Sequence, residues 1–342
     1  SSTPFQKDDV LIVSGGARGI TPLCVASLAR RIGGGTFFLM GRSAVVQEPA
    51  WAKNLEGKAL SDAVVTELRK LGTKPKPKDI SFLLEQIAGN REIADSVAKI
   101  NAAGGKAIYV ACDALSAQSV KALINQIHDQ YKLQVTGIIH GSGVLRDKKV
   151  EQKVPGDFDV VYGVKITGLA NLLEGLSPAE LTNLRHLVVF SSLAGYHGNV
   201  AQTDYSMAND ALSKMAHAFA RDYPNCRARS LCFGPWDGGM VTPQLKAHFQ
   251  ANGVQIIPRQ GGADQVAALL TLRCPGRIQV LVGNWGLAPV TPRQKIHHIR
   301  VSISGPVRET VSRLLLGTYV GWRVSGVEKE AGGGTGTGDC DI

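Results

Sequence analysis

The chain has 342 residues, of which 44% are hydrophobic and 19% are charged, so it can bury the core of one large domain or of two small ones. This composition excludes collagenous, intrinsically disordered and small disulfide-stapled proteins. The formal net charge of +10 favours phosphates or an acidic partner protein as ligands, and it also fits an ordinary solvated basic surface. Because the basic residues form no dense patch interleaved with aromatic residues, we do not expect nucleic-acid binding.

The sequence also predicts a protein without membrane insertion and without a metal site. No apolar run approaches the roughly 18 residues that are needed to cross a bilayer. The six cysteines form no CxxC pair and no zinc-ligand spacing, so we expect reduced, buried thiols in a cytoplasmic setting. The chain begins without Met, which leaves open a longer polypeptide with a targeting segment upstream.

Short β-rich apolar runs alternate with amphipathic segments of helix length along most of the chain. Such runs are typical of parallel strands that helices cover on both faces. The pattern predicts a Rossmann-type, doubly wound α/β fold in a domain of residues 1–288. Seven strands are expected, at residues 10–14, 36–41, 107–112, 135–140, 187–192, 228–234 and 278–283.

Two regions fall outside this alternation. Residues 45–105 separate the second and third strands and are too long for a simple crossover, so we expect a helical insertion with a turn or an extended linker at "TKPKPKD". Residues 289–342 lose the pattern and end in "EKEAGGGTGTGDCDI", which indicates a partly flexible tail or linker.

The first expected strand leads into "SGGARGIT" and then into a helical segment. A glycine-rich turn between a strand and a helix lets the backbone approach a pyrophosphate, and the helix N-terminus offers free N–H groups. The motif departs from GxGxxG in its spacing, and Thr21 stands where a third Gly is common. We expect dinucleotide binding rather than a plain tight turn, with contacts from Ser14, Gly15, Ala17, Arg18, Gly19 and Ile20.

The end of the second strand indicates which dinucleotide is bound. An acidic residue there would accept bonds from the ribose of NAD, but the sequence has Gly41, Arg42 and Ser43. Arg42 offers a cationic fork to a 2′-phosphate, and Arg18 in the turn supports this interpretation over that of a solvated arginine. The sequence therefore predicts NADPH as the cofactor.

Two further strand ends carry residues that suit a cofactor. In "CDAL", after the third strand, Asp113 would meet the adenine amino group, although a helix N-cap is an equally good interpretation. In "HGSG", after the fourth strand, small residues permit close approach. The expected contacts are Cys112, Asp113, Ala114, Gly141, Ser142 and Gly143.

A serine and a tyrosine indicate the class of enzyme. Ser192 ends the fifth strand, and Tyr205 follows 13 residues later at the start of an expected helix. In this arrangement the chain resembles the short-chain dehydrogenase/reductases. The resemblance implies that Ser192 polarises a substrate carbonyl and that Tyr205 gives its oxygen a proton. A phenol with an ordinary pKa of about 10 needs a nearby cation for this task.

Most of that superfamily carries the cation on a Lys four residues after the Tyr, but position 209 is Asn. In the ketoreductase domains of polyketide and polyunsaturated fatty acid synthases, the Lys lies instead in the helix before the fifth strand, and Asn follows the Tyr. Lys165, in "FDVVYGVKITGLANLLEG", occupies that place. The resemblance therefore implies a catalytic Lys165 that also bonds the cofactor's ribose, rather than a solvated lysine, and an Asn209 that positions Lys165 or a relay water.

The resemblance to these ketoreductases covers about residues 8–288. It includes "FSSLAGYHGN" and, after the sixth strand, "GPWDGGMVTPQLK", a loop that closes over cofactor and substrate in the family. It implies cofactor contacts from Gly234, Pro235 and Thr242, and also from Tyr205. Because Pro243 follows, Thr242 also suits a helix N-cap.

Markers of stereochemistry in that family are present as well. "LRD" resembles the family's Leu-Asp-Asp signature with its final Asp kept, and position 197 is His rather than the Trp of the opposite class. The resemblance implies a 3R product and substrate contacts from Leu145, Asp147, His197 and Met240. His197 is interpreted as a loop residue rather than as a catalytic acid.

Together with these motifs, the resemblance implies NADPH-dependent reduction of a 3-ketoacyl thioester on an acyl carrier protein, with other synthase domains as further partners. Two alternatives remain open: a free-standing reductase of small carbonyl compounds, and a scaffold that binds NADPH without turnover.

Overall fold

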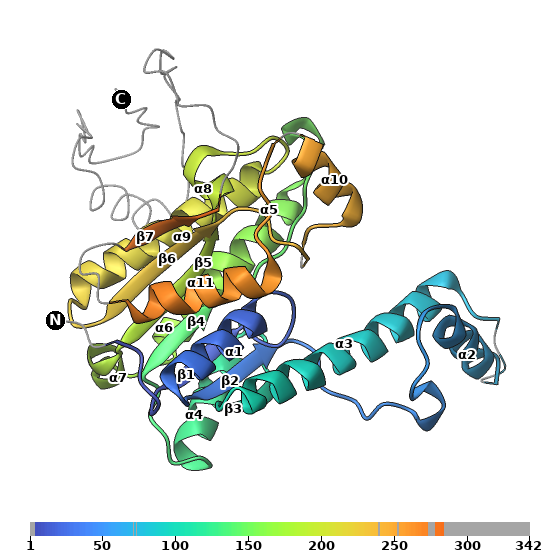
Figure 1. The fold of residues 1–342 in the computed structure, drawn as a ribbon, viewed down its shortest axis with the longest axis horizontal. Coiled ribbons are helices and arrows are strands. Elements are labelled where there is room, and N and C mark those ends of the chain that lie inside the picture. The colour runs from blue at the N-terminus through green and yellow to red at the C-terminus, as the bar shows by residue number, and fades with distance from the viewer. Residues whose placement is uncertain are drawn as a thin grey trace, which may run out of the picture.

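The computed structural model describes residues 4–70, 72, 74–238, 240–251, 253–272 and 278–283. Seven parallel strands form one sheet in the order β3-β2-β1-β4-β5-β6-β7 (Figure 1). The strand order reverses between β1 and β4, which is where ligands bind in open α/β sheets. The strands are β1 Val10–Ser14, β2 Thr36–Gly41, β3 Lys106–Ala111, β4 Gly137–His140, β5 His186–Ser192, β6 Arg227–Phe233 and β7 Gln279–Val282.

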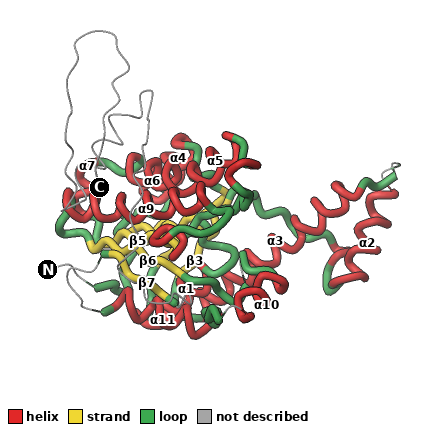
Figure 2. The backbone as a smooth tube through the Cα atoms, turned by 90° about the horizontal axis from the view of Figure 1, so that it is seen from above, coloured by secondary structure: helices red, strands yellow, loops and turns green. Residues whose placement is uncertain are grey.

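Helices cover both faces of the sheet, so that the domain has three layers (Figure 2). Side chains alternate along each strand, and β1 sends Leu11 and Val13 to one face and Val10 and Ile12 to the other. The first face packs against α1 Thr21–Ile32, α11 Arg259–Thr271 and the end of α3 Pro77–Ala102. The second face packs against α4 Ala117–Asp129, α6 Gly168–Glu174 and α9 Thr203–Asp222. The predicted doubly wound fold is confirmed, and the predicted strand bounds are within two residues of those observed.

Shorter elements connect these layers. The helices α5 Pro155–Tyr162, α7 Pro178–Asn183, α8 Leu193–His197 and α10 Pro243–Ala251 lie along the path from β4 to α11. Two 3₁₀ turns cover Ala50–Ala52 and Val150–Gln152, and a π turn, Gly163–Thr167, joins α5 to α6.

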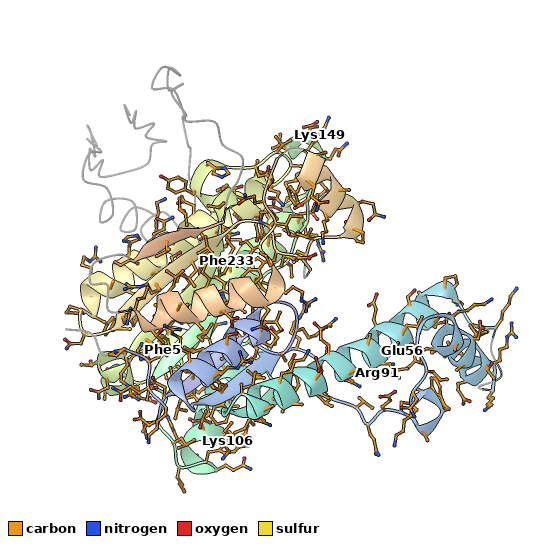
Figure 3. The ribbon with its side chains drawn as sticks, in the orientation of Figure 1. Phe5, Glu56, Arg91, Lys106, Lys149 and Phe233 are labelled. Carbon is orange, nitrogen blue, oxygen red and sulfur yellow. The ribbon has the colours of Figure 1, made fainter. Side chains whose placement is uncertain are left out.

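The predicted helical insertion forms an arm that projects away from the sheet (Figures 1 and 2). It consists of α2 Gly57–Lys70 and the first part of α3, which share a small apolar core around Val64 and Ile87. Arg91 joins α3 to the segment before α2 because its guanidinium donates to the carbonyls of Ala52 and Leu55 and binds Glu48 (Figure 3). Farther along α3, Ile93 and Ile100 enter the core of the main domain, so the base of the arm is fixed to the sheet.

Some predictions concern residues outside the described part of the chain. The tail, residues 289–342, lies there, as do Cys274 and Cys340. The cysteines that are described, Cys24, Cys112, Cys226 and Cys232, are buried free thiols. None of the helices in the described residues combines the length and the apolar character that a membrane span requires.

Candidate active site

A cavity of about 790 Å³ lies over the carboxyl ends of the strands, around the point where the strand order reverses. It is lined by the turn after β1, the ends of β2 and β3, the loop after β4, and the residues Lys165, Ser192 and Tyr205. All the residues predicted to contact cofactor or substrate, or to act in catalysis, line this cavity except Asp147, Asn209, His197 and Thr242.

Two glycines of the turn after β1 adopt backbone conformations that other residues rarely reach. Gly15 has φ +63° and Gly19 has φ +75°. A Cβ atom on Gly15 would lie 3.0 Å from the Cα of Ser142, so the turn packs directly on the loop after β4. On that loop, a Cβ on Gly141 would come within 2.5 Å of the Thr21 hydroxyl. Gly141 therefore provides the space that allows Thr21 to stand in place of a third Gly in the turn.

The arm contributes a wall of the cavity that the sequence analysis did not anticipate. Phe82, Glu85, Gly89 and Glu92 of α3 line it, and Gly89 and Glu92 lie beside the turn after β1. The Glu92 carboxylate accepts hydrogen bonds from the Gly19 N–H and the Arg18 Nε, each at 2.8 Å. No motif in the insertion could have revealed this contact, because it depends on how α3 packs against the sheet.

Tyr205 lies in the first turn of α9 and faces the cavity with Ser192, the last residue of β5. Burial raises the pKa of the Tyr205 phenol above its ordinary value, and the negative charge of Asp147 adds to this effect, while hydrogen bonding with Ser192 and Asn209 opposes it. Tyr205 is therefore a neutral phenol at neutral pH and holds a proton that it can donate.

Lys165 reaches the same cavity from the π turn. It is only 4% exposed, and its ammonium Nζ donates to the carbonyl oxygen of Phe190 on β5 at 2.6 Å. Burial lowers the pKa of Lys165 from 10.5 to about 8, because the charged form is deprived of water. The loop after β4 is tight against this side chain, since a Cβ on Gly143 would lie 3.1 Å from the Lys165 Cε.

A buried histidine connects the turn after β1 to Lys165. His140, at the end of β4, is fully buried; its Nδ1 lies 2.6 Å from the Ser14 hydroxyl, and its Nε2 lies 3.0 Å from the Lys165 carbonyl oxygen. Because a carbonyl only accepts, Nε2 carries the proton and Ser14 donates to Nδ1. Burial, with the nearby charge of Lys165, lowers the pKa of His140 to about 3, so the ring is neutral.

We expect His140→Asn to destabilise the fold by about 2–4 kcal/mol, because it leaves a void and unpaired polar groups. His140 has a lower pKa in the folded state than its ordinary 6.5, so its contribution is complete above pH 6.5 and is lost as the pH falls towards 3. The difference between wild type and variant should therefore shrink by about 2 kcal/mol at about pH 5. Urea unfolding at several pH values measures this; a difference that does not depend on pH would contradict the burial of a neutral ring.

The remaining predicted residues have structural contacts of their own. Asn209 is fully buried; its Nδ2 donates to the Tyr205 carbonyl at 2.8 Å, and its Oδ1 finds no hydrogen-bond partner in the described part of the chain. Asp147 accepts a bond from Gln202 at 2.8 Å, and Gln202 lines the cavity. The prediction of a loop at His197 is wrong, because this residue is the last of α8; its Nδ1 lies 2.9 Å from the Gly198 carbonyl oxygen.

The two residues with a possible N-cap role differ. Thr242 accepts from the N–H of Leu245 at 3.2 Å and so caps α10, while its contact with a cofactor stays a prediction. The N-cap interpretation of Asp113 is wrong, because Ser116 caps α4 by accepting from the N–H of Ser119. Asp113 instead accepts from the N–H of Leu115 and lines the cavity.

The chain is similar in sequence to several known proteins. The model of the KR domain family matches residues 10–238. A polyunsaturated fatty acid synthase polypeptide of Thraustochytrium sp. is 50% identical over 299 residues, which are 85% of this chain and 10% of that protein. A type I polyketide synthase of phenolphthiocerol synthesis from Mycobacterium bovis is 31% identical over 170 residues, which are 49% of this chain and 8% of that protein.

A solved ketoreductase from the first module of phoslactomycin biosynthesis in Streptomyces sp. has a similar fold. It superposes with a TM-score of 0.60 at 20% identity, over 83% of this chain and 55% of that one. The chain spans about a tenth of the length of the curated relatives. The family match and the sequence identity agree: the chain belongs to the KR domain family.

Proposed function

We propose that the chain reduces a 3-ketoacyl thioester, carried on an acyl carrier protein, to the 3R-hydroxyacyl product with NADPH, as the reductase domain of a cytoplasmic synthase. The observation that carries the proposal is that Lys165, Ser192 and Tyr205 line the same cavity as the glycine-rich turn. The match to the KR domain family adds support, as does the similar fold of the solved ketoreductase of phoslactomycin biosynthesis.

The residues around the cavity fit a phosphate-bearing cofactor. The Gly19 N–H and the Arg18 guanidinium already bind an anion in this structure, the carboxylate of Glu92. Arg42 is exposed at the end of β2 and lines the same cavity, so two guanidinium groups are available for a 2′-phosphate. When bound, NADPH would supply the hydride that reduces C3.

Side chains of the cavity would stabilise and then neutralise the negative charge that develops on the carbonyl oxygen. Ser192 would donate a hydrogen bond to this oxygen, and Tyr205 would transfer its phenolic proton to it. The Lys165 ammonium, whose pKa is about 8, is mostly charged at neutral pH and would stabilise the phenolate that remains. The unpaired Oδ1 of Asn209 is suited to hold a water that returns a proton to Tyr205.

Partner and stereochemistry are further parts of the proposal. A net charge of +10 favours an acidic carrier protein, and the curated relatives are long synthases of which this chain matches a small part. Residues 1–288 would be the reductase domain and 289–342 a linker. Leu145 and Met240 line the cavity and would contact the acyl chain. The 3R product is proposed from the resemblance of the "LRD" segment alone.

An assay of NADPH consumption separates this proposal from its alternatives. The same 3-ketoacyl group is offered on an acyl carrier protein and on a short thioester mimic, and kcat/KM is expected to be about tenfold or more higher on the carrier, from the added protein contacts. Equal values would favour a free-standing reductase of small carbonyls. Binding of NADPH without oxidation by either substrate would favour a non-catalytic scaffold.

A further inference from the structure

We propose that Glu92, on the helical insertion, is an internal anion that the 2′-phosphate of the cofactor displaces, so that this residue sets how strongly the protein prefers NADPH to NADH. The inference rests on the proposed function, because it assumes that Arg18 receives the 2′-phosphate. It gives the helical insertion a role in cofactor specificity.

The geometry around Glu92 is that of a bound anion. Its Oε2 lies 2.8 Å from the Arg18 Nε, and its Oε1 accepts the Gly19 N–H at 2.8 Å. A guanidinium and a backbone N–H of a glycine-rich turn are donors that also bind phosphate groups. The carboxylate therefore occupies donors that suit a cofactor phosphate.

The exchange of one anion for another needs little rearrangement. The side chains of Arg18 and Glu92 are 59% and 39% exposed, so solvent screens the pair and it is easily broken. The backbone of α3 is held at this point by the buried side chain of Ile93, which belongs to the main core. Only the Glu92 side chain would have to turn away.

The Arg18 side chain lies against the arm. A Cβ on Gly89, one turn before Glu92 on α3, would lie 3.3 Å from the Arg18 Nη1, so the glycine leaves room for the guanidinium beside the helix. Arg42 lines the same cavity from the end of β2. A phosphate bound between the two arginines would have the Glu92 carboxylate as its negative neighbour.

This arrangement has a consequence for affinity. Glu92 stabilises Arg18 in the absence of cofactor and repels a 2′-phosphate in its presence, so both effects reduce the affinity for NADPH. NADH has no 2′-phosphate and does not compete for Arg18. Competition for the Gly19 N–H affects both cofactors alike, because both carry a pyrophosphate. The charge of Glu92 should therefore lower NADPH affinity selectively.

The test compares Glu92→Gln with Glu85→Gln, which removes the same charge from the same helix and cavity wall without touching the Arg18 pair. Dissociation constants for NADPH and NADH are measured by cofactor fluorescence without substrate. Glu92→Gln is expected to bind NADPH about fivefold more tightly, in line with the loss of one partly exposed charge, and NADH within about twofold of wild type. Glu85→Gln is expected to leave the ratio of the two constants unchanged.

Two further measurements make the test decisive. Adenosine 2′,5′-bisphosphate should gain affinity in Glu92→Gln as NADPH does, whereas adenosine 5′-monophosphate should not. In an Arg18→Met background, Glu92→Gln should lose most of its effect, because the competing donor is gone. Weaker NADPH binding in Glu92→Gln, or equal gains for NADPH and NADH, would overturn the inference and assign Glu92 a supporting role in the turn.

Failure of this inference and failure of the proposed function give different results. If wild type prefers NADPH and Glu92→Gln does not change the preference, only the role of Glu92 is wrong. If wild type binds NADH as tightly as NADPH, the proposed cofactor is wrong, and the displacement by a 2′-phosphate fails with it.

Discussion

Replacing Tyr205 by Phe is expected to lower turnover of a 3-ketoacyl thioester by about 10²- to 10⁴-fold, which is the usual contribution of a positioned proton donor. The phenylalanine keeps the ring at the start of α9 and removes only the hydroxyl that faces the cavity with Ser192. NADPH affinity should change little, because the turn after β1 and the two arginines are untouched. Steady-state NADPH oxidation and a binding titration measure the two effects.

Tyr196→Phe is the matched control for this substitution. Tyr196 lies in α8, is 61% exposed and is not among the residues that line the cavity. Its loss of a hydroxyl should leave both turnover and stability close to wild type. A Tyr205→Phe variant as active as Tyr196→Phe would remove Tyr205 from the proposed chemistry.

Lys165→Met is expected to combine the loss of activity with a gain in stability. Without the ammonium, the phenolate of Tyr205 would lose its neighbouring positive charge, and turnover should fall by about 10²-fold or more. Lowering the pKa of Lys165 from 10.5 to about 8 corresponds to a burial cost of about 3 kcal/mol at neutral pH. Methionine avoids this cost but leaves the Phe190 carbonyl unpaired, so we expect a net gain of about 1–2 kcal/mol.

The pH dependence of this gain identifies its cause. Below pH 8 the lysine is protonated in both states and the full cost of burial is present. As the pH rises from about 8 to 10.5, the unfolded chain holds more protons than the folded one, so wild-type stability rises relative to Lys165→Met. Urea unfolding of both proteins across this range should show the gain shrinking; a constant gain would contradict the perturbed pKa.

Lys153→Met is expected to change stability in the opposite direction to Lys165→Met. Lys153 is also largely buried, but its Nζ lies 2.7 Å from the Oδ1 of Asp204, whose side chain is only 1% exposed. Removing this lysine leaves a buried carboxylate without its cation, so the variant should be less stable than wild type by about 3 kcal/mol or more. If both lysine variants changed the free energy of unfolding in the same direction, the lack of an acidic partner for Lys165 would not explain the stability change of Lys165→Met.

The outline of the fold could be predicted because its signals are local. Continuous apolar runs such as "VLIVS" and "LVVFSS" mark strands buried on both faces, and the structure places β1 and β5 there. The spacing between Ser192 and Tyr205 is likewise a local signal, because it can be counted along the sequence. The catalytic role of Lys165 could be predicted only from the resemblance to a family. A lysine in a helical segment is usually exposed to solvent, and its near neighbours in the sequence do not show that it is buried.

Other features depend on contacts between distant segments, and these could not be predicted. The hydrogen bond from Gly19 to Glu92 spans 73 positions in the chain, and the one between Ser14 and His140 spans 126. The N-cap interpretations of Asp113 and Thr242 also depended on where the neighbouring helices begin, while their contacts with a cofactor stay predictions. Ser116 rather than Asp113 caps α4, and Thr242 caps α10.

The sequence by itself determined the class of fold, the order of its strands along the chain, and the residue types that suit cofactor and substrate. It did so because periodicity, glycine-rich turns and residue spacing depend on near neighbours. The tertiary structure alone decided how those residues behave. Packing brings Lys165 into a buried site that lowers its pKa to about 8, keeps His140 neutral between Ser14 and the π turn, and puts Glu92 on the glycine-rich turn after β1. Burial and charge at a site are properties of everything that surrounds it, and the surroundings exist only in the folded chain.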